Sequence, residues 1–243
     1  MSDSDRISSP DTARGVGFDP TAQPLLQCEA LPGLPAECLR LDYIRSAFQR
    51  PVSWQVEPLF TDSFSPGMPG LSDARQAAVL MPLVQREQGL HVVFTRRAEH
   101  LHDHAGQISF PGGRIEAGDR DPIAAALRET QEEIGVNGQF VRVIGVQPSF
   151  LTVTRFVMTP IIGELLPGFT IQTDRREVAE VFEVPLEVLL DPARHRLHAL
   201  HLPGDAGARC YFSITWQSYF IWGATAVLIR NFYHYLAAAH LGE

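Results

Sequence analysis

The chain has 243 residues, of which 45% are apolar and 20% charged, a composition that excludes disorder throughout its length. Its formal net charge of -8 argues against a protein that grips nucleic acid through backbone phosphates, while a small phosphate ligand neutralised by metal stays compatible. Three widely spaced cysteines fit a reducing compartment, and neither a secretory signal nor a run of about 18 apolar residues occurs. We therefore expect a cytoplasmic protein without a membrane anchor.

The N-terminal part of the chain is predicted to lie outside the regular domain. Residues 1–30 are rich in Ser, Asp, Pro and Gly with little apolar periodicity, so we expect a disordered tail. From Pro35 the apolar residues follow helical spacing, which predicts a short amphipathic helix that ends before Pro51. Prolines and glycines then break the pattern. Residues 31–72 thus form a helix and an irregular connector.

The regular domain is expected over residues 73–243. Two apolar, β-prone runs, 77–84 and 90–95, are separated by a polar turn and predict a hairpin. The segment 178–190 reads as a strand followed by the start of a helix, and 224–239 as a helix. Further single strands are expected at 141–148, 157–165 and 211–222. Strands interleaved with helices in this order indicate an α+β fold, an α/β/α sandwich with a mixed sheet between helices.

One helix, 122–134, carries an unusual cluster of acidic residues. Asp121 and Pro122 predict its N-cap and first turn, and Gly135 its end. Three glutamates fall at positions i, i+3 and i+4 on a face turned away from the apolar one: Glu129, Glu132 and Glu133. They repel one another at the negative end of the helix dipole, and Mg²⁺ or Mn²⁺ prefers such oxygen ligands. A metal site explains this cluster, and a solvated face is the alternative.

A Gly-Gly turn precedes this helix, and Arg-Glu-x-x-Glu-Glu-x-Gly occupies its end. Together they resemble the signature of the Nudix hydrolases, which implies a Nudix fold and metal-dependent hydrolysis of a diphosphate bond. The loop between turn and helix is one residue longer than in the general pattern, and Asp119 stands where Glu is usual. The matching residues are Gly113, Arg128, Glu129, Glu132, Glu133, Gly135 and Val136.

A second motif directly upstream is similar to that of one Nudix subgroup, the coenzyme A pyrophosphatases, which also carry a lengthened loop. His102 stands where the subgroup has Arg. The matching residues are Thr95, Arg97, Ala98, Gly106, Phe110, Pro111, Gly112 and Gly113. The resemblance implies that coenzyme A or its acyl form is cleaved to 3′,5′-ADP and 4′-phosphopantetheine.

The resemblance also implies roles for individual residues. Glu129, Glu132 and Glu133, with the carbonyl of Gly112, would hold Mg²⁺ or Mn²⁺ against the diphosphate. Arg128 would orient a helix carboxylate. Nudix enzymes take their general base from the helix or from a later loop. Among loop residues the candidate is Glu177, for which an exposed loop glutamate is the alternative reading.

Substrate contacts are expected from the same motifs. Gly112 and Gly113 form the turn that faces the substrate, and Arg97 is the cation best placed by motif to meet its phosphates. Arg96 and Arg155 are further candidates, with structural ion pairs as the alternative.

Three other readings stay open. The enzyme could act on ADP-ribose, a dinucleotide or an oxidised nucleoside triphosphate, because His102 departs from the subgroup motif. A catalytically silent nucleotide-binding module is the second, against which the complete Arg-Glu-x-x-Glu-Glu argues. The alternating histidines 100, 102 and 104 would suit zinc, although they lie in a loop expected to face substrate. Assembly as a homodimer is also left open.

Overall fold

The computed structural model describes residues 19–60, 74–101, 104–152, 154–200 and 209–242. Its larger sheet has the order β4-β3-β2-β8-β6, with β5 on β2, β7 on β8 and β9 on β3. β2 and β8 run parallel and the other pairs antiparallel, so the sheet is mixed. The strands are β2 (Arg75–Arg86), β3 (Gly89–Arg97), β4 (Ile108–Ser109), β5 (Gly112–Arg114), β6 (Val141–Val146), β7 (Phe150–Leu151), β8 (Phe156–Leu165) and β9 (Val178–Pro185). The hairpin predicted at the start of the domain is confirmed as β2 and β3.

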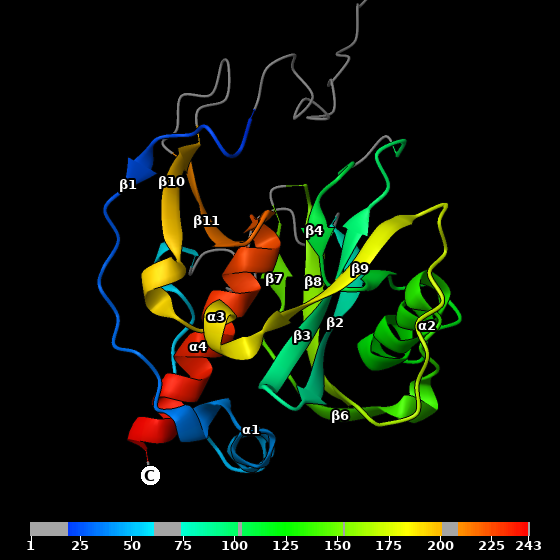
Figure 1. Cartoon of the computed structure of the whole chain (residues 1–243), viewed down its shortest axis with the longest axis horizontal. Helices are drawn as coiled ribbons and strands as arrows, with labels where there is room; N and C mark the ends of the chain where they lie inside the picture. Colours follow the sequence, from blue (N-terminus) through cyan, green and yellow to red (C-terminus); the bar gives the residue numbers. More distant parts are fainter. Residues whose placement is uncertain (1–18, 61–73, 102–103, 153, 201–208, 243) are drawn as a thin grey trace, which may run out of the picture.

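Helices cover both faces of this sheet, which confirms the α/β/α sandwich (Figure 1). Helix α2 (Pro122–Ile134) lies on one face, and α1 (Leu41–Phe48), α3 (Leu186–Leu189) and α4 (Ala224–Leu241) lie on the other. The alternation of side chains along β2 explains the two layers, because successive residues point to opposite faces. Ala78 and Leu80 pack with α2, whereas Val79 and Met81 belong to the core under α4. Short 3₁₀ helices occur at Ala36–Leu39, Gly138–Phe140 and Pro192–Arg194.

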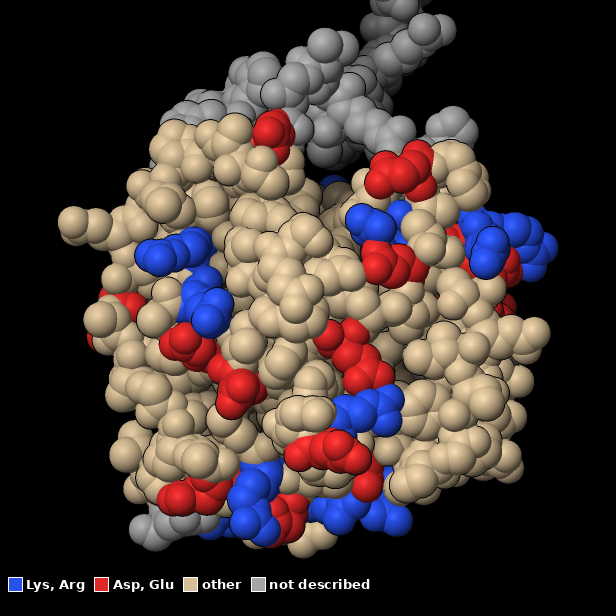
Figure 2. Space-filling view, in the orientation of Figure 1, with Lys and Arg blue, Asp and Glu red and all other residues tan. Residues whose placement is uncertain are grey.

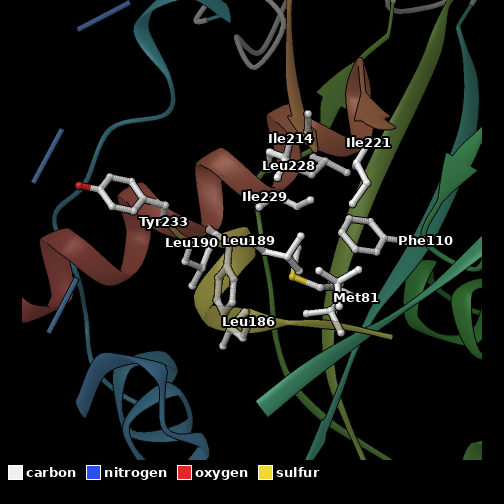
Figure 3. Packing of buried hydrophobic residues seen from close by; sticks show 14 of the residues in the cluster. Met81, Phe110, Leu186, Leu189, Leu190, Ile214, Ile221, Leu228, Ile229 and Tyr233 are labelled. Atoms are coloured by element: carbon white, nitrogen blue, oxygen red, sulfur yellow. The ribbon is translucent and has the colours of Figure 1, made fainter. Parts of the chain in front are cut away.

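The core on the α4 side joins four parts of the chain (Figure 3). Met81 comes from β2 and Phe110 from the link between β4 and β5, and Leu186, Leu189 and Leu190 come from α3 and its end. Ile214 and Ile221 come from a second sheet, and Leu228, Ile229 and Tyr233 from α4. Burial of this much apolar surface fixes α4 against the sheet. No helix in the described part of the chain combines the length and apolar character that a membrane span requires.

A second, four-stranded sheet was not predicted as such. It consists of β1 (Leu25–Leu26), β10 (Arg196–Leu200), β11 (Arg209–Trp216) and β12 (Tyr219–Trp222), in that order. The expectation of one strand over 211–222 was wrong, because the chain turns at Gln217, whose φ is 51°, and folds back. Only two residues separate β11 from β12, so the turn is hidden in an apolar run. Of the expected tail, residues 1–18 lie outside the described residues, and β1 lies within 19–30.

Candidate active site

The acidic helix is held by the end signals expected from the sequence. The side chain of Asp121 accepts a hydrogen bond from the Ala124 N–H at 2.7 Å, and Gly135 ends α2 in the left-handed conformation with φ 74°. Its buried residues are Ala125, Ala126, Thr130, Glu133 and Ile134. The expectation of three glutamates turned away from the buried face therefore holds for two of them, whereas Glu133 is buried.

The Gly-Gly turn lies directly against β2 and α2. Gly112 pairs with Val79 and has φ 152°, and a Cβ there would lie 2.3 Å from the Ala78 carbonyl oxygen. A Cβ on Gly113 would lie 2.5 Å from the carboxylate carbon of Glu129. A side chain at position 112 would clash with the β2 backbone, and one at position 113 would displace the Glu129 carboxylate. The two glycines thus let a helix carboxylate approach the backbone of the turn.

Glu133 is the most buried of the three helix glutamates, with 5% of its surface exposed. The Gly112 N–H donates to its Oε2 at 3.1 Å, and the Arg97 guanidinium lies 4.0 Å from its Oε1. Burial raises the pKa of Glu133 to about 8, and repulsion from Glu129 and Glu177 adds to this shift. The hydrogen bond from Gly112 and the charge of Arg97 only partly oppose it. This carboxylate is therefore short of positive charge.

Arg128 binds four groups at once. Its Nε and Nη2 donate to the two oxygens of Asp119 at 3.1 and 3.0 Å, and its Nη1 donates to Glu129 and Glu132, each at 3.0 Å. Nη2 also donates to the Arg114 carbonyl at 3.0 Å. The hydrogen bonds to Asp119 and Glu129 raise the pKa of Arg128, and the contact with Arg128 lowers the pKa of Asp119. The longer loop thus places its carboxylate on this arginine.

Glu129 lies between the arginine and the glycine turn. Burial raises its pKa against the opposing effect of Arg128, and repulsion from Glu132 and Glu177 contributes. Glu177 is exposed in the turn before β9, where its carbonyl accepts a hydrogen bond from Ala98 N–H at 2.8 Å. Its charge acts on both Glu129 and Glu133, so the fold brings this loop residue to the helix carboxylates.

Two other basic residues, Arg96 and Arg155, were candidates for substrate contacts. Arg96 pairs with Glu180 at 2.6 Å, and Glu180 also accepts a hydrogen bond from Tyr219 at 2.7 Å. This is the ion pair named as the alternative for Arg96. Arg155 is exposed before β8, with φ 62°, and its carbonyl accepts a hydrogen bond from Arg75 N–H. Figure 2 shows acidic and basic side chains next to one another at several places on the face it presents.

The histidines expected as an alternative zinc site are only partly described. His102 lies outside the described residues, and Nδ1 of His104 is 2.6 Å from Oε1 of Gln107 in a hydrogen bond. Nowhere in the described ranges do three His, Cys, Asp or Glu side chains stand grouped for a metal ion.

The helix carboxylates fit a hard divalent cation by their chemistry. Glu129 and Glu133 are oxygen donors at the glycine turn, their pKa values are raised, and the charge of Glu177 is added to theirs. A cation would relieve each of these penalties. Arg128 now holds Glu129 and Glu132, so these two side chains would have to turn from it to share a cation with Glu133.

Comparisons with known proteins show what this chain is similar to. A family model described as NUDIX domain matches residues 74–202. A protein of Enterobacter sp. (strain 638), described as uncharacterized Nudix hydrolase NudL, is 43% identical over 158 residues, which cover 65% of this chain and 80% of that protein. A protein of the same name from Salmonella paratyphi B is similar to the same extent. The solved Nudix hydrolase RenU of M. smegmatis is 20% identical, with a TM-score of 0.41, over 49% of this chain and 74% of that one.

The protein is a hydrolase that acts on phosphorus-containing anhydrides, with a pyrophosphate-containing substrate. More particularly, the chain belongs to the Nudix family, since the family model spans more than half of it. Enzymes of this family generally use divalent metal ions.

Proposed function

We propose that this enzyme hydrolyses the diphosphate bond of coenzyme A or acyl-coenzyme A, releasing 3′,5′-ADP and 4′-phosphopantetheine or its acyl form. The observation that carries the proposal is the position of Arg97. This residue belongs to the upstream motif shared with coenzyme A pyrophosphatases, and its guanidinium lies 4.0 Å from the buried carboxylate of Glu133. The motif segment and the acidic helix thus meet at one place, as a shared diphosphate site requires.

The proposed roles follow from the contacts. Glu129, Glu132 and Glu133, with the Gly112 carbonyl, would hold Mg²⁺ or Mn²⁺. When bound, this ion neutralises phosphate oxygens and lowers the pKa of a water molecule. Arg128 orients two of these carboxylates through its own hydrogen bonds.

Glu177 is the proposed general base. It is exposed, so water reaches it, and its charge raises the pKa values of Glu129 and Glu133. It would take the proton of the attacking water while the bond between phosphorus and the bridging oxygen breaks. Replacement by Gln removes the proton acceptor without a large change of shape. We expect Glu177→Gln to lower kcat at least about tenfold at unchanged KM, whereas an exposed loop glutamate without this role would leave both constants unchanged.

On the substrate side, Arg97 would meet the diphosphate, with Gly112 and Gly113 lining its approach. Arg155, on the exposed turn before β8, stays a candidate for a substrate phosphate. Arg96 is the weaker candidate, because Glu180 already pairs with it.

The test is a product analysis by mass spectrometry with purified protein and Mg²⁺ or Mn²⁺. The substrates are coenzyme A, acetyl-coenzyme A, NADH, ADP-ribose and 8-oxo-dGTP, compared by kcat/KM. We expect 3′,5′-ADP from the two coenzyme A substrates at the highest efficiency. If 3′,5′-ADP does not form, coenzyme A is excluded as substrate.

A second candidate is Nudix hydrolysis of ADP-ribose, a dinucleotide or an oxidised nucleoside triphosphate. The presence of His102 at the position of the motif arginine favours it. A higher efficiency with one of these substrates in the same panel would identify it.

A further inference from the structure

Two arginines, Arg75 and Arg114, lie close to the glycine turn. Arg75 begins β2, and Arg114 ends β5 directly after Gly113. Arg114 is paired with Ala77, two positions along β2 from Arg75, so the two arginines project from the same face of the sheet. Both are exposed, and among the described residues neither forms an ion pair with a carboxylate. This sets them apart from Arg96, which is paired with Glu180.

The two guanidinium groups lie over one aromatic ring. The central carbon of Arg75 is 4.2 Å from the centre of the Phe156 ring, and that of Arg114 is 5.7 Å from it. A guanidinium stacked on a ring keeps its planar N–H edge available, and this edge matches two oxygens of a phosphate. Two positive groups at one ring also repel each other. A bound anion would remove this repulsion and satisfy both edges.

The position of Arg75 and Arg114 relative to helix α2 indicates which anion they would bind. Arg114 follows Gly112 by two residues, about 6.6 Å along an extended strand. Its carbonyl also accepts the 3.0 Å hydrogen bond from Arg128. These arginines are thus near enough along the chain for one substrate to contact both them and the glycine turn, where Glu133 accepts a hydrogen bond from Gly112. In coenzyme A, one ribose separates the diphosphate from a phosphate monoester.

We propose that Arg75 and Arg114 form a subsite, supported by Phe156, for the 3′-phosphate of the adenosine part of the substrate. This inference rests on the proposed coenzyme A activity and adds the group that distinguishes coenzyme A from nucleotides without a 3′-phosphate. A phosphate monoester carries nearly two negative charges at neutral pH and three acceptor oxygens, enough for two guanidinium edges.

The kinetic test crosses variants with substrates. Arg75→Gln, Arg114→Gln and the double variant are assayed with coenzyme A and with 3′-dephospho-coenzyme A. The matched control is Arg194→Gln, an exposed arginine that pairs with Asp191 at 3.3 Å. We expect each single variant to raise KM for coenzyme A about tenfold, as loss of a charged hydrogen bond does, and to leave the dephospho substrate within about twofold. Equal losses with both substrates would assign the arginines to the diphosphate and overturn the proposal, as would no loss at all.

A binding measurement keeps this inference separate from the activity. Titration calorimetry compares 3′,5′-ADP with AMP, which lacks the 3′-phosphate. Wild type should bind 3′,5′-ADP about tenfold more tightly than AMP, and the double variant should bind both alike. If wild type does not cleave coenzyme A, the proposed function fails, and this preference still decides on the subsite. Equal binding of the two ligands by wild type would overturn it.

Discussion

Two buried glutamates, Glu57 and Glu133, show opposite electrostatics in one molecule. Glu57 is 3% exposed and Glu133 is 5% exposed, so burial opposes the charge of both. Glu57 accepts hydrogen bonds from the buried Arg230 and from Nε2 of His234, and its backbone N–H donates to Asn231 at 2.9 Å. Glu133 has one backbone donor and a guanidinium 4.0 Å away. The carboxylate of Glu57 thus has two cationic or hydrogen-bonding side chains as partners, whereas that of Glu133 has a single hydrogen bond and a more distant guanidinium.

The pKa values follow this difference. Burial alone would raise the pKa of Glu57, but the hydrogen bonds from His234 and Arg230 outweigh it and lower the pKa to about 2. For Glu133 burial dominates, and its pKa rises to about 8. A buried charge with full partners is compensated within the fold, whereas one without them costs stability and is retained where function needs it. We therefore assign Glu57 to the attachment of the connector to α4 and Glu133 to chemistry.

The largest effect is expected at Glu57. Glu57→Gln leaves the buried Arg230 without a counter-charge, and removing one partner of a buried ion pair costs about 3 to 5 kcal/mol of unfolding free energy. Urea unfolding measures this loss, with Glu29→Gln, at an exposed position, as the control. Activity per folded molecule should stay unchanged. A loss below about 1 kcal/mol would remove the contrast with Glu133.

Glu133→Gln should have the opposite signature. We expect turnover to fall at least about a hundredfold, as loss of a metal ligand does. The unfolding free energy without metal should stay equal or increase, because a neutral amide removes the cost that the raised pKa of Glu133 imposes on folding. The control is Glu116→Gln, in the exposed loop before the helix. Near-normal turnover in the folded variant would show that Glu133 holds no metal.

The sequence predicted the acidic helix α2 but not the buried ion pair of Glu57 and Arg230, because the two are encoded differently. Asp121, Pro122 and Gly135 specify α2 locally, and the glutamates follow within one helix. Glu57 and Arg230 are 173 residues apart, and neither stands in a pattern that identifies its partner.

Two features of the site could not be predicted from the sequence. The burial of Glu133 depends on how α2 is rotated against the Gly-Gly turn, which helical periodicity resolves only coarsely. The pairing of Asp119 with Arg128 depends on the path of the longer loop. In the second sheet, β1 and β10 are short strands of two and five residues, and only their pairing with each other and with β11 marks them as strands.

A third prediction concerns the effect of pH on His195, which contacts the buried ion pair of Glu57 and Arg230. Nδ1 of His195 accepts a hydrogen bond from Arg230 at 3.3 Å, while Nε2 donates to the Leu189 carbonyl at 2.7 Å. Burial first, with the charge of Arg230, lowers the pKa of His195 to about 4. The unfolded chain binds this proton near pH 6.5 and the folded protein only near pH 4, so acidification favours unfolding within that window.

Between pH 6.5 and 5, protonation of His195 in the unfolded chain should lower the free energy of unfolding by about 2 kcal/mol. The measurement is urea unfolding at both pH values for wild type and His195→Gln. The difference between the two proteins isolates His195, because the remaining groups titrate in both. Parallel pH dependences would contradict a neutral, buried His195.

The smallest effect is expected at Arg128, whose hydrogen bonds connect Asp119 in the loop before α2 to Glu129 and Glu132 of that helix. Lys keeps the positive charge but cannot reproduce the fork that bonds both oxygens of Asp119 and also reaches Glu129 and Glu132. Arg128→Lys should therefore lower kcat/KM about tenfold and raise the Mg²⁺ concentration needed for half-maximal activity, as loss of a group that orients metal ligands does. Arg120→Lys, at an exposed arginine paired with Asp121, is the matched control. An unchanged Mg²⁺ requirement together with reduced stability would show that Arg128 has a structural role, like that of Arg230. The contrast between the acidic helix and the Glu57–Arg230 pair would then depend on Glu133 alone.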